Sequence, residues 1–197
     1  MERLIFFSDA IVAIAITLLA LALKIDAASE RHITFADLLR PWKTYLAFIL
    51  SFVNIAGFWQ RHHTIFCYIR KIDQRMLVLN LGWLFFIVVL PFTTSILSLH
   101  FSDTPAIFLY ASNVFMLSLM QKLIWGYGAD ELTDALDTER AKHIDLMFSL
   151  DMLNGIVAII VSFFYPTAAF ILLFFKIPLF VVASLYFAAE RRKKYIK

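Results

Sequence analysis

The chain has little charge and only one cysteine, and both shortages limit what it can be. Charged residues make up 17% of its 197 residues, whereas soluble domains carry about 25%. With Cys67 alone, neither an internal disulfide nor a cysteine metal cluster can form. The sequence contains no nucleophile triad, phosphate-binding loop or paired carboxylates, so we do not expect an enzyme. We also find no internal repeat and no low-complexity stretch.

Apolar residues are abundant instead. They form 61% of the chain and gather into runs long enough to cross a bilayer. We therefore predict an all-α, polytopic membrane protein with six transmembrane helices, in a single domain covering residues 1–197. The predicted spans are residues 3–23, 41–60, 77–97, 105–124, 144–165 and 167–189.

Basic residues lie mainly on one side of this predicted topology. By the positive-inside rule that side is the cytoplasm, and an even number of spans then makes both termini cytoplasmic. The net charge of +3 is explained by orientation and by contact with lipid headgroups, and it gives little support for nucleic acid binding. The tail either anchors anionic lipid through Arg191, Arg192, Lys193 and Lys194 or simply flanks the last span. The other basic residues on the predicted cytoplasmic side are Arg3, Arg61, Arg70, Lys71, Arg75, Lys122, Arg140, Lys142 and Lys197.

Polar residues of three predicted spans fall at the same depth, near the cytoplasmic side. A carboxylate inside the bilayer costs about 2.5 to 3.5 kcal/mol, so Asp9 needs partners. We predict that Ser8 and Asp9 are hydrogen-bonded to the second and third spans, with Arg3 close enough to help hold the charge of Asp9. This layer is either a structural clasp between helices or a site where Asp9 binds a proton or an ion. The predicted partners are Trp59, His62, His63 and Asn80.

The first span also carries an aliphatic stripe. Ile14, Leu18 and Leu21 follow the i, i+4, i+7 spacing of one helical face, and Thr17 lies between them in depth. In a monomer this stripe is an ordinary packing surface. In a symmetric oligomer with the first helix on the axis, it forms stacked aliphatic rings, and such constrictions gate by dewetting. Periodicity alone does not choose between these two interpretations.

One motif resembles a known family. The pattern Arg3-x-x-x-Phe7-Ser8-Asp9, followed by AIVAIAITLLAL, resembles the first helix of the transmembrane protein 175 family of organellar and prokaryotic potassium channels. The sequences WQRHH at residues 59–63 and LNLGWLFFIVVLPFTT at residues 79–94 are similar to that family at the right spacing. The six-span layout extends the resemblance over the whole chain.

The resemblance implies a potassium-selective homotetramer in a prokaryotic plasma membrane, with the first helix lining the pore and no cofactor. It implies that the hydrophobic constriction falls on Ile14, Leu18 and Leu21, with Ile14 as the principal gate. It also implies that the hydroxyl layer that favours potassium falls on Thr17, so that K⁺ passes transiently near Ile14 and Thr17.

Two sequence features resemble known kinds of site, a potassium-channel filter and a metal site, but lack the residues around them that such sites need. Residues 126–128 read GYG, as in the filter of ordinary potassium channels, but no re-entrant pore helix precedes them, so we interpret them as a helix-ending turn. His62, His63 and Cys67 suggest a metal site, yet adjacent helical positions point about 100° apart and no fourth ligand is evident.

Other classes of membrane protein remain open at this point. A proton- or cation-coupled secondary transporter would use Asp9, Asp151 or Lys176 during alternating access, although no inverted repeat supports it. Asp151 and Lys176 also fit a structural ion pair inside the bundle. A non-conducting membrane scaffold is the third possibility.

Overall fold

The structure is a computed structural model that describes residues 2–21, 23, 32–69, 71–131 and 138–174, without the side chains of residues 130–143. Within these residues all regular structure is helical, as the sequence predicts, and residues 166–174 begin a further helical segment. The helices are α1 (Glu2–Ala20), α2 (Phe35–Leu39), α3 (Trp42–Tyr68), α4 (Gln74–Leu99), α5 (Thr104–Glu131) and α6 (Thr138–Ser162).

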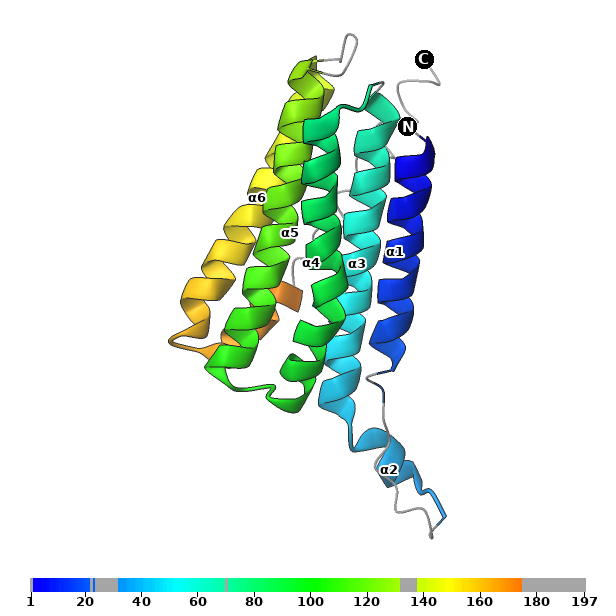
Figure 1. Ribbon diagram of the computed structural model, residues 1–197. Coiled ribbons are helices and arrows are strands. Elements are labelled where there is room, and N and C mark those ends of the chain that lie inside the picture. The colour runs from blue at the N-terminus through cyan, green and yellow to red at the C-terminus, as the bar shows by residue number, and fades with distance from the viewer. Residues whose placement is uncertain (1, 22, 24–31, 70, 132–137, 175–197) are drawn as a thin grey trace, which may run out of the picture.

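The five long helices run side by side as a bundle, and the short α2 projects from one end of it (Figure 1). The central helix is α4, which packs against α1, α3 and α5, while α6 packs along α5. In the described part of the chain, four helical stretches are long and apolar enough to cross a bilayer: Glu2–Ala20, Gln74–Leu99, Thr104–Ala129 and Ile144–Ser162. The 27 residues of α3 measure about 40 Å, which is also sufficient, but this helix is more polar. The predicted sixth span, residues 167–189, lies mostly outside the described residues.

Prolines mark helix starts, where a missing amide hydrogen costs little. Pro41 is the N-cap of α3, and Pro105 is the second residue of α5. Two predicted helix ends were wrong: α3 continues eight residues past Gln60 and α5 continues past Ile124. Both extensions stay helical because they remain in the core, where Ile65, Phe66 and Trp125 are buried. The helix α2 was not predicted; a capping box between Thr34 and Asp37 starts it.

The predicted turn at residues 126–128 was also wrong, because these residues lie inside α5. A Cβ on Gly128 would lie 2.7 Å from Ile69 Cδ1 and 3.2 Å from Met76 Cε. The glycine is therefore explained by close packing of α5 against the α3–α4 connection, which the sequence motif does not reveal.

A cluster of buried hydroxyl and amide side chains holds α3, α4 and α5 together. Ser51 and Asn54 of α3 lie 3.1 and 3.0 Å from the Tyr110 hydroxyl of α5. Thr94 of α4 lies 2.7 Å from the Ser51 hydroxyl and donates to the carbonyl of Leu90. Because buried polar groups need partners in a membrane interior, this cluster fixes α3, α4 and α5 against one another, and α1 packs on two of them, α3 and α4.

Candidate functional site

Helix α1 has one buried face and one exposed face. Ser8, Val12, Ala15 and Leu19 are buried, and they follow the spacing of a single helical face. On the other side, the predicted gate residues are exposed: Ile14 by 58%, Leu18 by 43% and Leu21 by 68%. The aliphatic stripe is thus left uncovered by the part of the chain that the structure describes.

Thr17 lies on the same exposed face, between the aliphatic residues. Its hydroxyl donates to the carbonyl of Ile14 at 2.7 Å, which is the back-bonding common for threonine in helices. This bond uses the only hydroxyl proton. The oxygen lone pairs remain available on the exposed face, and lone pairs are what a cation binds.

Ser8 is joined to two other helices through Asn80. The side-chain amide of Asn80 on α4 donates to the Ser8 hydroxyl at 3.0 Å, and Ser8 donates to the carbonyl of Leu4 at 2.9 Å. The Oδ1 atom of Asn80 lies 2.7 Å from His62 Nε2 of α3. Since Oδ1 can only accept, His62 carries a proton on Nε2. The His62 ring also stacks on Trp83, with centroids 4.2 Å apart.

Asp9 has a separate partner. The indole Nε1 of Trp59 donates to Asp9 Oδ1 at 2.8 Å, and His63 stacks on the Trp59 ring rather than contacting the carboxylate. Arg3 is exposed and makes no ion pair with Asp9 among the described residues. Phe7, the remaining residue of the motif, is half exposed. The hydrogen bonds predicted for Ser8 and Asp9 are therefore present, as two contacts with different helices: Ser8 with Asn80 of α4, and Asp9 with Trp59 of α3.

A third polar cluster was missed by the sequence analysis. Arg61 of α3 forms an ion pair with Asp151 of α6, with Nη2 and Oδ2 2.9 Å apart, and its Nε donates to Gln121 Oε1 of α5 at 3.2 Å. The two charged side chains are only 12% and 14% exposed, so Arg61, which the sequence analysis only counted among the basic residues of the cytoplasmic side, is paired inside the bundle. A charge this close to an apolar run should have suggested an opposite partner in another span.

Several predicted residues lie elsewhere. Cys67 and His63 are exposed whereas His62 is buried, and the described residues contain no cluster of three or more His, Cys, Asp or Glu that could hold a metal. Lys176, Arg191, Arg192, Lys193 and Lys194 lie outside the described residues.

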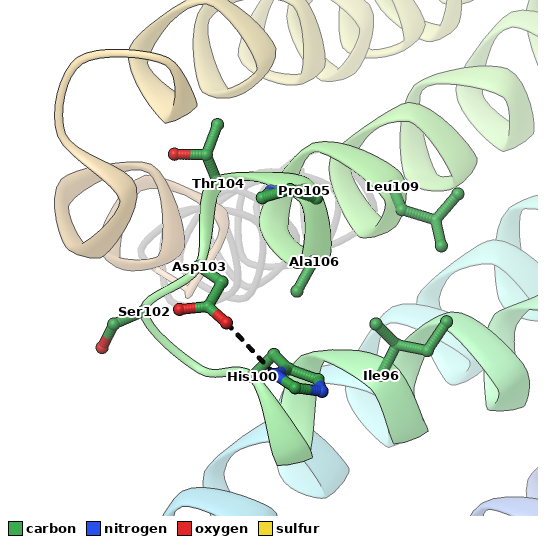
Figure 2. A pocket seen from close by; sticks show the side chains of 8 residues that line it. All are labelled: Ile96, His100, Ser102, Asp103, Thr104, Pro105, Ala106 and Leu109. Carbon is green, nitrogen blue, oxygen red and sulfur yellow. Dashed lines mark hydrogen bonds and ion pairs between the residues drawn. The ribbon is translucent and has the colours of Figure 1, made fainter.

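A surface pocket is found at the far end of α4 from Asn80, between α4 and the start of α5 (Figure 2). It is lined by residues from Ile96 to Leu109, and its polar contact is a 3.1 Å pair between the exposed side chains of His100 and Asp103. None of the predicted site residues lines it.

The fold and the site define a multi-pass membrane protein whose first helix is fixed by polar contacts on one face and leaves an aliphatic face uncovered. Residues 3–91 match the family model described as endosomal/lysosomal potassium channel TMEM175. A protein named as a potassium channel from Chryseobacterium sp. (strain P1-3) is 31% identical over 173 residues, which cover 85% of each chain. The chain belongs to the TMEM175 family.

Two further similarities extend this assignment. The crystal structure of a lysosomal potassium-selective channel TMEM175 homolog from Chamaesiphon minutus superposes with a TM-score of 0.83 at 26% identity, covering 93% of this chain and 97% of that one. The human endosomal/lysosomal proton channel TMEM175 is 30% identical over 128 residues, which are 64% of this chain and 25% of the human protein. These relatives are channels and not enzymes.

Proposed function

We propose that this chain is a potassium channel that conducts K⁺ passively across a prokaryotic plasma membrane, as a homotetramer with α1 around the pore and both termini in the cytoplasm. The observation that carries the proposal is the division of α1 into a buried face containing Ser8 and an exposed face containing Ile14 and Leu18, with the exposed Leu21 directly after the helix. Membership of the TMEM175 family and the potassium channels among its relatives support the same conclusion.

In this proposal the exposed residues become rings around the axis. Four copies of Ile14, Leu18 and Leu21 form stacked apolar rings, which exclude water and therefore a hydrated ion. Ile14 forms the principal gate, and opening requires this ring to widen. No cofactor takes part, because passive conduction needs only the ion gradient.

Thr17 supplies the oxygen that the rings lack. An ion that loses water between the Ile14 and Leu18 rings needs replacement ligands, and channel filters use protein oxygens for this purpose. The Thr17 hydroxyl is oriented by its bond to the Ile14 carbonyl, so its lone pairs are directed away from that bond. We propose that K⁺ is held transiently at this level.

The polar contacts keep α1 in place while ions pass. Ser8 is held by Asn80, and Asp9 is held by Trp59, so the cytoplasmic half of α1 is fixed in depth and rotation. We therefore assign Asp9 to the structural clasp rather than to ion binding.

Flux measurements on purified protein in liposomes test this function. We expect K⁺ to move down its gradient without any second ion, with single-channel current steps and with more permeation for K⁺ than for Na⁺. Flux that needs a coupled ion would instead establish the transporter alternative that uses Asp9, Asp151 or Lys176, and intact tetramers without flux would establish a scaffold. A proton gradient applied without K⁺ measures whether protons also permeate, as the name of the human relative suggests for that protein.

A further inference from the structure

One turn of α3 contacts helices on several sides. Trp59 bonds to Asp9 of α1, and His62 bonds to Asn80 of α4. Between them, Arg61 reaches Gln121 of α5 and Asp151 of α6. Successive helical residues point about 100° apart, which is why one turn can reach four neighbours. We refer to residues 58–62 of α3 as the junction turn.

The guanidinium of Arg61 suits this position. Its planar fork presents several donors at once, so one side chain can bind a carboxylate on one helix and an amide on another. It does both here, and it also lies over the Phe58 ring, with the guanidinium carbon 4.7 Å from the centroid. A lysine in its place would offer a single charged point and could not reproduce both contacts in the same geometry.

Gln121 ties the same junction turn to α5 a second time. Its Oε1 accepts from Arg61 and its Nε2 donates to the carbonyl of Phe58 at 2.6 Å. Gln121 is fully buried, so both contacts are in the interior of the bundle. The junction turn is thus held to α5 by a side chain and by the backbone of α3, and to α6 by an ion pair.

We propose that Arg61 is a positioning residue for the pore helix: by binding Asp151 and Gln121, it fixes the junction turn, and through Trp59 and His62 it sets where α1 stands relative to α5 and α6. This inference rests on the proposed channel function. Because Arg61 makes its contacts on the side of α5 and α6, it acts on how often the Ile14 ring opens and leaves the current through an open channel unchanged.

Single-channel recording of Arg61→Gln provides the test, and the chain offers a matched control. Lys122 of α5 also binds α6, with Nζ 2.6 Å from Ser149 Oγ and 3.6 Å from Asp145 Oδ1, but neither partner belongs to α3. We expect Arg61→Gln to change the open probability by about 2- to 30-fold, the range found for residues that couple distant sites. Lys122→Gln should leave it unchanged, and unitary conductance should stay the same in both variants.

Two further variants separate positioning from simple loss of a charge. Arg61→Lys keeps a cation for Asp151 but loses the planar fork of the guanidinium. Its open probability should therefore lie between those of wild type and Arg61→Gln. Asp151→Asn should resemble Arg61→Gln, and combining these two should add little beyond either one, since both remove the same ion pair. Should Arg61→Gln not assemble, Asp151→Asn and Arg61→Lys carry the same comparison.

A distance measurement makes the test independent of conduction. Spin labels at Ala20 of α1 and Ile160 of α6, both exposed, report the separation of these helices in a Cys67→Ser background diluted with unlabelled chains. Arg61→Gln should shift or broaden this distance and Lys122→Gln should not. An unchanged distance, an altered unitary conductance, or equal effects of both variants would each overturn the proposal. A shifted distance in a protein whose wild type carries no flux would retain the positioning role and reject the channel function.

Discussion

Trp59 and Asp9 are joined by a hydrogen bond of 2.8 Å from the indole Nε1 to the carboxylate. The neighbouring Ser8 is bound from a different helix, through Asn80 of α4. Two residues adjacent in sequence are therefore held from two directions, one by α3 and one by α4. This arrangement fixes both the depth and the rotation of α1, and rotation decides which residues its exposed face presents.

The first prediction concerns the stability contributed by Asp9. Hydrogen bonds between membrane helices average about 0.6 kcal/mol and reach about 1.7 kcal/mol. Because Asp9 has one such bond, Asp9→Ala should lower the melting temperature of the detergent-solubilised oligomer only modestly, and Trp59→Phe should do the same. The double variant should be no worse than either single one. An Asp9→Ala protein of normal stability but altered ion permeation would mean that Asp9 faces the ion path.

The second prediction is that Asn80 contributes more than Asp9 to the stability of the oligomer. Asn80 bridges Ser8 and His62, and both partners are fully or almost fully buried. Each buried group left without a partner costs about 1 to 3 kcal/mol, so Asn80→Ala should reduce the yield and melting temperature of intact oligomer more strongly than Asp9→Ala. The control is Asn113→Ala, which removes a single bond, from Asn113 to the carbonyl of Phe86 at 3.2 Å. Equal losses in the two asparagine variants would contradict a bridging role for Asn80.

The third prediction concerns the gate. If Ile14 closes the narrowest ring, an amide in its place lets water enter and lowers the barrier to a hydrated ion. A barrier lower by about 1.4 kcal/mol corresponds to a tenfold rise in rate, so Ile14→Asn should raise K⁺ flux by about tenfold or more. Ile160→Asn makes the same chemical change at an exposed position of α6 and should leave flux unaltered. Unchanged flux in correctly assembled Ile14→Asn protein would remove Ile14 from the pore axis.

Part of this architecture follows from the sequence because apolar length and proline position are local properties. The runs around α1, α4, α5 and α6 are visible without any structure, and Pro41 and Pro105 locate two helix starts within one or two residues. The ends of α3 and α5 are not visible in this way. The extensions beyond the apolar runs contain residues such as His63 and Gly128 that do not signal a continuing span, whereas the burial of Ile65, Phe66 and Trp125 keeps these extensions in the core.

The sequence predicts which residues of the candidate site lie at the same depth, but it does not predict all the contacts between them. Shared depth brings Ser8, Asp9, Trp59 and Asn80 into one layer, because depth follows from counting residues along each helix. Which donor meets which acceptor depends on helix rotation, and the sequence alone does not give it. Arg61 shows the limit: its partner Asp151 lies 90 positions away in the chain, on a helix that packs along α5.

Asp73, outside the membrane-spanning segments, provides a pH-dependent prediction. Hydrogen bonds from the Tyr127 hydroxyl and from the Met76 amide lower the pKa of Asp73 below its ordinary value of 3.8. A lowered pKa in the folded state means that this contribution to stability is present above pH 3.8 and is lost as the pH falls through the folded-state value. Tyr127→Phe should therefore reduce the melting temperature at neutral pH, with a difference from wild type that shrinks at acidic pH. In an Asp73→Asn background the effect of Tyr127→Phe should no longer depend on pH, and a persisting pH dependence would assign it to another group.

The last prediction separates two uses of Thr17. Its hydroxyl proton is already bonded to the Ile14 carbonyl at 2.7 Å, so a purely structural role would end there. If the oxygen lone pairs also bind a partly dehydrated K⁺, Thr17→Val removes a ligand while nearly preserving shape. A loss of about 1 kcal/mol in the preference for K⁺ over Na⁺ would reduce the permeability ratio about fivefold. Bi-ionic reversal potentials measure this ratio, and Thr17→Ser, which keeps the oxygen, should stay close to wild type. Equal permeability ratios in wild type, Thr17→Ser and Thr17→Val would restrict Thr17 to its bond with Ile14, since in that case the oxygen contributes nothing to the choice of ion.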